Sequence, residues 1–149
     1  MRRRIRLGLV ALAAILVACS GDSPAVEGTP PASLPHETIL GAQVAIHGTS
    51  SVTHRTTGIE AMDNFFTPTI LRGAPGVKVL VLLRNGGAVT HNFTLPGSDI
   101  SRDIGPGDLR EANVTFPSSG SLEFYCRFHR DSSQMIGAFR SDGSIPSPK

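Results

Sequence analysis

Short apolar segments separated by Gly- and Pro-rich turns make up most of the chain between residues 38 and 141. Segments of this length and spacing are typical of an all-β sandwich or barrel. No stretch of ten or more residues has clean helical periodicity. The predicted strands cover residues 40–46, 58–62, 77–83, 92–95, 110–116, 120–126 and 136–140. About 100 residues are enough for one hydrophobic core, so we expect one all-β domain over residues 38–141.

Two of these strands carry further information in their pattern. Residues 77–83 are nearly all apolar, which is expected of a strand that is covered on both faces. Residues 122–126 alternate, and the two-residue period of a strand puts Leu122, Phe124 and Cys126 on one inward face. The sequence therefore predicts that the Cys126 thiol lies beside the core, at the end of a strand.

The first 18 residues have the features of a secretory signal. Four arginines precede an apolar run of eleven residues, 7–17, which is too short to span a bilayer. The run ends in Leu16-Val17-Ala18-Cys19, which resembles a bacterial lipobox. This resemblance implies cleavage before Cys19 and attachment of diacylglycerol to its sulfur, whereas the simpler alternative is an ordinary cleaved signal peptide. We expect residues 1–18 to be a lipoprotein signal peptide and the domain to lie outside the cytoplasm, anchored to the bacterial membrane.

The segments that flank the predicted domain look like linkers. Residues 19–37 contain four prolines with scattered Ser, Gly and Thr, and they show neither helical nor strand periodicity. A Pro-rich segment of this length extends up to about 50 Å. We therefore expect residues 19–37 to be a lipid-anchored tether and residues 142–149 to be a flexible C-terminal tail.

Removal of the signal changes the charge and the cysteine count. Four of the 14 Lys and Arg residues lie in the signal, which leaves 10 against 12 Asp and Glu in the mature chain. Without a cluster of basic residues, we expect no nucleic-acid partner. Cys126 becomes the only thiol of the folded domain, because Cys19 carries the lipid. A lone cysteine in an exported protein is a metal ligand, a reactive thiol, half of an intermolecular bridge or a buried apolar residue.

Candidate metal ligands surround this cysteine in the sequence. His129 and Met135 follow it, and His91 stands 35 residues before it, next to Asn92. One thiolate, two imidazoles and a thioether are the donor set of a type 1 copper site. His91 and Met135 also have ordinary interpretations that involve no metal. His91 could be a hydrogen-bonded histidine at a strand end, and Met135 could be a methionine of the core. The remaining histidines, for which we expect solvent exposure, are His36, His47 and His54.

From Asp63 to Phe139 the chain resembles the cupredoxins, the family of plastocyanin, pseudoazurin and amicyanin. The motifs that carry the resemblance are Asn64-Phe65-Phe66-Thr67-Pro68, Asn85-Gly86-Gly87 leading to His91-Asn92-Phe93, Gly105-Pro106-Gly107, Val114-Thr115-Phe116-Pro117 and Phe124-Tyr125-Cys126. Separate motifs in the right order are more specific than one motif alone. The resemblance implies a Greek-key β-sandwich of about seven or eight strands.

The resemblance also implies roles for individual residues around one mononuclear copper. His91, Cys126 and His129 are expected to form the ligand plane, with Met135 as a weak axial ligand, and Asn92 to tie its strand to the cysteine loop. Five residues separate His129 from Met135, one more than in plastocyanin-like loops. Gln134 is therefore the alternative axial ligand, because an amide oxygen replaces Met in some sites of this type.

We expect a membrane-tethered electron carrier that is not an enzyme, and a copper storage or delivery protein is the alternative. A catalytic zinc held by His91, Cys126 and His129 is a third hypothesis, but no Asp or Glu stands at an obvious general-base spacing. A cysteine hydrolase is a fourth, and it lacks a nucleophile-elbow motif. The resemblance implies that the second histidine reaches the surface where partners dock. Because Arg127 and Arg130 flank Phe128 and His129, we expect an acidic redox protein to bind there. We also expect the protein to be a monomer.

Overall fold

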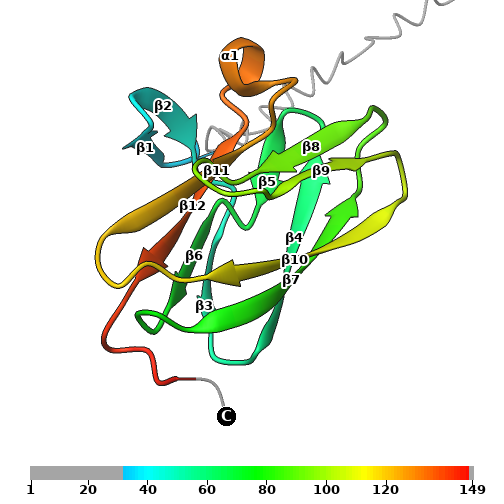
Figure 1. Ribbon diagram of the computed structural model, residues 1–149. Helices are drawn as coiled ribbons and strands as arrows, with labels where there is room; N and C mark the ends of the chain where they lie inside the picture. Colours follow the sequence, from blue (N-terminus) through cyan, green and yellow to red (C-terminus); the bar gives the residue numbers. More distant parts are fainter. Residues whose placement is uncertain (1–31, 148–149) are drawn as a thin grey trace, which may run out of the picture. The chain divides into compact units, whose positions relative to one another are not determined.

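Twelve strands and one helical turn form the described part of the chain, residues 32–147 of the computed structural model (Figure 1). The expected signal peptide, Cys19, most of the expected tether and the last two residues lie outside the described residues. Within the described range, no helix is both long and apolar enough to cross a membrane. The elements are β1 (His36–Ile39), β2 (Ala42–Ala45), β3 (Thr49–Val52), β4 (Thr56–Met62), β5 (Phe65–Thr67), β6 (Ile70–Gly73), β7 (Lys78–Asn85), β8 (His91–Thr94), β9 (Ser101–Ile104), β10 (Leu109–Thr115), β11 (Ser121–Tyr125), α1 (Arg130–Ser133) and β12 (Ile136–Ser141).

Two sheets and a separate hairpin account for all of these strands. One sheet has the order β3-β6-β12-β11-β8-β9, the other has the order β10-β7-β4-β5, and β1 pairs with β2. The chain passes repeatedly from one sheet to the other, so neighbouring strands in a sheet are often distant in sequence. The prediction of an all-β sandwich is confirmed, and the first strand begins at His36, two residues inside the expected tether.

The expected number of seven or eight strands is too low. The missed strands have only three or four residues each, and they are β1, β3, β5, β6 and β9. In β3 and β9 only one residue is buried, Val52 and Ile104 respectively, so no two-residue period shows in the sequence. The predicted strand at residues 40–46 is in fact half of the β1–β2 hairpin, because Leu40 and Gly41 take positive φ and form its turn.

Strand β12 is covered on both faces, and β7 is not. In β7, Val79, Val81 and Leu83 are buried, whereas Leu80 and Leu82 on the other face are only partly buried. The first four residues of β12 are all buried. The β1–β2 hairpin explains the difference, because its apolar side chains pack with those on the outer face of β12 and of β6. This second cluster contains Ile39, Val44, Ile46, Ile70, Ile136 and Ala138.

Five buried phenyl rings fill the space between the two sheets. Phe124 of β11 lies at their centre, with ring centroids 5.1 Å from Phe66, 5.0 Å from Phe93 and 5.2 Å from Phe139. Phe139 in turn packs edge to face on Phe116 at 5.4 Å. Such aromatic pairs add about 0.5–1.5 kcal/mol each beyond the area that they bury. The cluster fixes β11 two residues before Cys126, and Cys126 is itself part of the same core, as predicted.

Candidate metal centre

Cys126 lies directly after β11 and is completely buried. Its backbone N–H donates to the carbonyl oxygen of Met135 at 3.0 Å, which closes the base of the loop between these two residues. Its Sγ accepts a hydrogen bond from the backbone N–H of Asn92 at 3.3 Å. The thiol is therefore held against the neighbouring strand β8, with a donor directed at the sulfur.

His91 is the first residue of β8 and is also buried. On one side of its ring, Nε2 lies 3.3 Å from Oδ1 of Asp63. On the other side, Nδ1 is buried and has no hydrogen-bond partner among the described residues. A buried polar atom without a partner is costly and needs an explanation, and a metal ion is one of the standard explanations.

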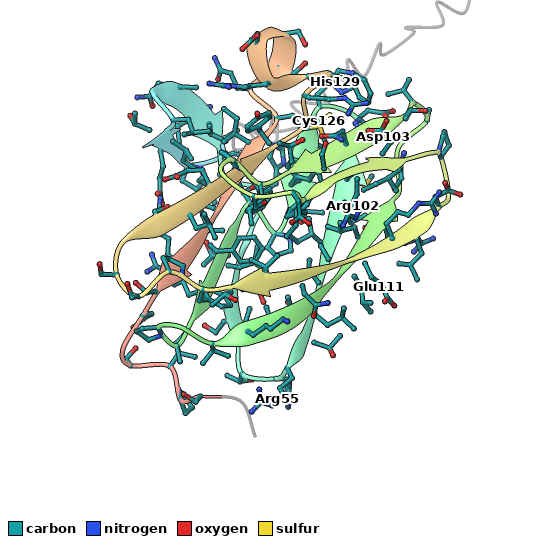
Figure 2. The ribbon with its side chains drawn as sticks, in the orientation of Figure 1. Arg55, Arg102, Asp103, Glu111, Cys126 and His129 are labelled. Atoms are coloured by element: carbon teal, nitrogen blue, oxygen red, sulfur yellow. The ribbon has the colours of Figure 1, made fainter. Side chains whose placement is uncertain are left out.

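His129 completes the group from the loop that follows Cys126. Its backbone N–H donates to the carbonyl oxygen of Cys126 at 3.1 Å, so the two residues share one tight turn. Its Nδ1 lies 3.5 Å from Cys126 Sγ, and its ring centroid lies 5.0 Å from that of His91. Figure 2 shows Cys126 and His129 at the end of the sandwich formed by β8, β9 and α1.

The three side chains form a donor set that suits copper. One ligand atom from each of His91, Cys126 and His129 lies within 4.8 Å of the others. A thiolate favours Cu(I) and imidazoles suit Cu(II), so the mixture serves both oxidation states. The orphaned Nδ1 of His91 fits the same interpretation, because a ligand nitrogen needs a free lone pair.

Burial and the neighbouring charges keep the His91 imidazole in the form that binds metal. Burial lowers the pKa of His91 below its ordinary value, the Asp63 carboxylate opposes this shift, and His129 adds to it. The hydrogen bond to His91 in turn lowers the pKa of Asp63. At neutral pH the site therefore contains a neutral imidazole and an ionised carboxylate behind it.

The two candidate axial residues occupy very different places. Met135 is 0% exposed and belongs to the main core cluster. Gln134 is exposed, ends α1 with a positive φ of 54°, and lines a surface pocket between α1 and the β1–β2 hairpin. Gln134, the residue after α1, is therefore directed outward, whereas Met135 is buried in the same core cluster as Cys126.

Asn92 links three segments around the cysteine. Its side-chain amide donates to Asp103 Oδ1 at 2.7 Å and to Ser101 Oγ at 3.2 Å on β9. Its Oδ1 accepts from the backbone N–H of Arg127 at 3.5 Å. Arg127 also pairs with Asp103 at 2.6 Å. The contact that was expected between the β8 strand and the cysteine loop is therefore present, and Asp103 extends it to β9.

The other three histidines lie apart from this group. His36 and His54 are exposed, as expected. His47 is only partly exposed, and its ring stacks on Phe65 with centroids 3.7 Å apart and planes 12° apart. The expectation of full solvent exposure is wrong for His47, because the Phe65 ring covers one of its faces.

Residues 38–136 match the family model of a cupredoxin-like domain. The chain belongs to the cupredoxin family. No curated protein sequence matches the chain. The family match covers all four expected ligands and residues 63–136 of the segment that resembles plastocyanin-like proteins in the sequence.

Several solved structures have the same fold. Reduced auracyanin from Roseiflexus castenholzii is 15% identical, with a TM-score of 0.52 over 61% of this chain and 99% of that one. The blue copper protein auracyanin A from Chloroflexus aurantiacus is 18% identical, with a TM-score of 0.50 over 62% and 99%. The metal-binding domain of the Cu(I)-exporting P-type ATPase CopA from Streptococcus pneumoniae D39 is 12% identical, with a TM-score of 0.53 over 66% and 99%.

Sequence reasoning missed Asp63 as part of the site. Asp63 lies in the β4–β5 turn, 28 residues before His91, and nothing in its sequence context points to a histidine partner. The only signal was its place directly before the Asn64-Phe65-Phe66 motif. Its role depends on a contact between distant segments, which only the folded structure reveals.

The position of Met135 leads to a prediction about the axial ligand. Met135→Leu should retain coloured Cu(II) but raise the reduction potential, because loss of a weak donor disfavours Cu(II) more than Cu(I). Gln134→Ala is the matched control, and it should leave the spectrum and the potential unchanged. Voltammetry and visible spectra of both variants check this prediction. An unchanged potential in Met135→Leu, with a shifted one in Gln134→Ala, would transfer the axial role to Gln134.

Proposed function

We propose that this protein is an electron carrier that uses one mononuclear type 1 copper held by His91, Cys126, His129 and Met135. The observation that carries the proposal is the close approach of three donor atoms at a buried end of the sandwich, with a lone imidazole nitrogen left free. Bound copper would supply a centre that gains and loses one electron. The protein supplies a fixed and largely dry surrounding for it.

The rigidity of the ligand segments supports electron transfer in particular. Cys126 is fixed by the Phe124 cluster and by the Asn92 N–H, and the base of its loop is closed by Met135. A site that is packed in this way cannot change its shape much between oxidation states. The structural cost of each electron transfer is therefore small.

A catalytic zinc site fits the structure less well. A zinc hydrolase needs an open fourth position and a base that reaches the bound water. The carboxylate in contact with the group is Asp63, and it lies against Nε2, on the side of the His91 ring opposite the free Nδ1. Asp63 is thus placed to hold a ligand, and we propose that the chain has no enzyme activity by itself.

Addition of Cu(II) to the purified metal-free protein tests the assignment. We expect strong blue or green colour from thiolate-to-copper charge transfer, and complete loss of this colour in Cys126→Ser, because a hydroxyl is not a soft thiolate donor. His54→Gln, which changes an exposed histidine, should keep the full colour. A colourless complex of the wild-type protein, or an intensely coloured Cys126→Ser, would contradict the type 1 assignment.

Copper delivery is the alternative function, and a copper-exporting ATPase contains a domain of the same fold. A delivery protein releases its metal, whereas an electron carrier keeps it through many cycles. In the same experiment, repeated reduction and reoxidation in the presence of a modest Cu(I) chelator should leave the copper content constant. Loss of copper at each reduction, while the domain stays folded, would favour delivery.

We further propose that electrons pass through His129 to an acidic partner protein. His129 is partly exposed, and the neighbouring Phe128 is 47% exposed. The two arginines beside them are less free than the sequence suggests. Arg127 lies over the Phe128 ring at 4.6 Å and pairs with Asp103, while Arg130 lies 3.9 Å from Asp131. The apolar Phe128 surface therefore provides much of the contact, and the arginines steer the encounter.

Small charged oxidants test this steering without the natural partner. Arg130→Glu should slow oxidation by the anionic hexacyanoferrate(III) at low salt, and the effect should fade as salt screens the charge. Arg55→Glu is the matched control, because Arg55 lies at the opposite end of the sandwich from His129 (Figure 2). Stopped-flow rates measure both variants. Equal slowing in the two would show that only net charge matters and that His129 is not the electron port.

The membrane tether rests on the first 37 residues of the sequence. We propose that diacylglycerol on Cys19 anchors the domain outside the cytoplasm, because the apolar run before it is too short to span a bilayer. Expressed in a bacterial host, Cys19→Ala should leave the membrane fraction and still bind copper. A variant that stays in the membrane fraction would point to an uncleaved signal or to another anchor.

A further inference from the structure

The turn between β4 and β5 contacts both segments that carry the metal ligands. Asp63 Oδ1 lies 3.3 Å from His91 Nε2 and also accepts from the backbone N–H of Ala88 at 2.9 Å. The next residue, Asn64, accepts through Oδ1 from Ser133 Oγ at 2.8 Å, in the loop between His129 and Met135. Two consecutive residues thus hold the strand of the first histidine and the loop of the second.

Gly87 leaves the space in which Asp63 and His91 meet. A Cβ on Gly87 would collide with Asp63 Oδ1, and it would lie only 2.9 Å from His91 Nε2. Any side chain at residue 87 would therefore displace the carboxylate or the ring. Gly87 does not have a positive φ, so its small size, and not its backbone freedom, is what this position uses.

The two nitrogens of His91 have opposite surroundings. Nε2 faces an ionised carboxylate, which only accepts hydrogen bonds, so Nε2 must carry the proton. The neutral ring then has its lone pair on Nδ1, which is buried, lies near Cys126 and His129, and has no hydrogen-bond partner within residues 32–147. A hydrogen bond to one ring nitrogen decides which nitrogen is free for a metal.

We propose that Asp63 is a positioning residue that fixes the tautomer and ring orientation of His91 and whose negative charge stabilises Cu(II) relative to Cu(I). This inference rests on the proposed role of His91 as a copper ligand. Asp63 is half-exposed and contacts the His91 ring. The competing explanation is that Asp63 is only a turn residue that satisfies the Ala88 N–H.

Two substitutions separate the charge of Asp63 from its positioning. Asp63→Asn keeps an oxygen that accepts from both His91 and Ala88 but removes the charge. Asp63→Ala removes both. Asp131→Asn is the control, because it removes one fully exposed carboxylate from the ligand loop. Three measurements apply to each variant: Cu(II) affinity by chelator competition, reduction potential at low salt, and the ¹⁵N shifts of the His91 ring in the metal-free protein.

We expect different results from the two variants. Asp63→Asn should keep the colour and the tautomer while the reduction potential rises, and each tenfold change in the ratio of Cu(II) to Cu(I) affinity corresponds to about 59 mV for one electron. Asp63→Ala should lower Cu(II) affinity about 10- to 100-fold, which is the usual effect of removing the hydrogen-bond partner of a metal-ligating histidine. It should also give a mixture of His91 tautomers. Asp131→Asn should change none of the three measurements appreciably.

The inference is overturned if Asp63→Asn and Asp63→Ala change potential and affinity no more than Asp131→Asn does. It is also overturned if the ¹⁵N shifts of the metal-free wild-type protein place the proton on Nδ1. If Asp63→Ala does not fold, the Asp63→Asn variant and the ¹⁵N shifts of the wild-type His91 ring are sufficient to test the inference. Absence of copper colour in the wild type, with the proton on Nε2, would instead refute the proposed function and leave the tautomer assignment intact.

Discussion

The site depends on one constraint: a thiol and an imidazole from segments 35 residues apart must meet at a buried position. The hydrogen bond from the Asn92 N–H to Cys126 Sγ connects these segments directly, because Asn92 follows His91 in the chain. The phenyl cluster around Phe124 fixes the strand that ends at Cys126. Without this packed core, the ends of β8 and β11 would not be held at fixed positions relative to each other. The hydrophobic core therefore sets the positions at which Cys126 and His91 meet.

The parts of the site that are local in sequence were predictable. Cys126 and His129 are three residues apart, so one tight turn brings them together whatever the rest of the fold does. His91 was a candidate from its residue type, but only the resemblance to cupredoxins paired it with Cys126, since spacing alone does not say which strands become neighbours. Asp63 has no such signal, because its partner is set by the parallel pairing of β4 with β7 and by the absence of a side chain on Gly87.

The fold class followed from the spacing of apolar segments, but the strand count did not. Strands such as β3 have one buried residue and gain their place from pairing with β6, which no local pattern encodes. The same limit explains the error about β7. An apolar strand can be covered on one face and half-exposed on the other, and here the β1–β2 hairpin covers β12 instead. The elements that pack against a strand, and not its composition, decide whether it is buried on both faces.

The loop between His129 and Met135 places its residues in a helical turn at the surface, outside the core. The loop forms the helical turn α1, in which the Ser133 N–H donates to the His129 carbonyl oxygen at 3.1 Å. Gln134 then takes a left-handed conformation, and the Met135 N–H returns to the same carbonyl at 3.3 Å. The turn is therefore directed outward, toward the β1–β2 hairpin (Figure 1). Because the Cys126 and Met135 backbones remain hydrogen-bonded, the two ends of the loop stay in register, and Met135 remains in the same core cluster as Cys126.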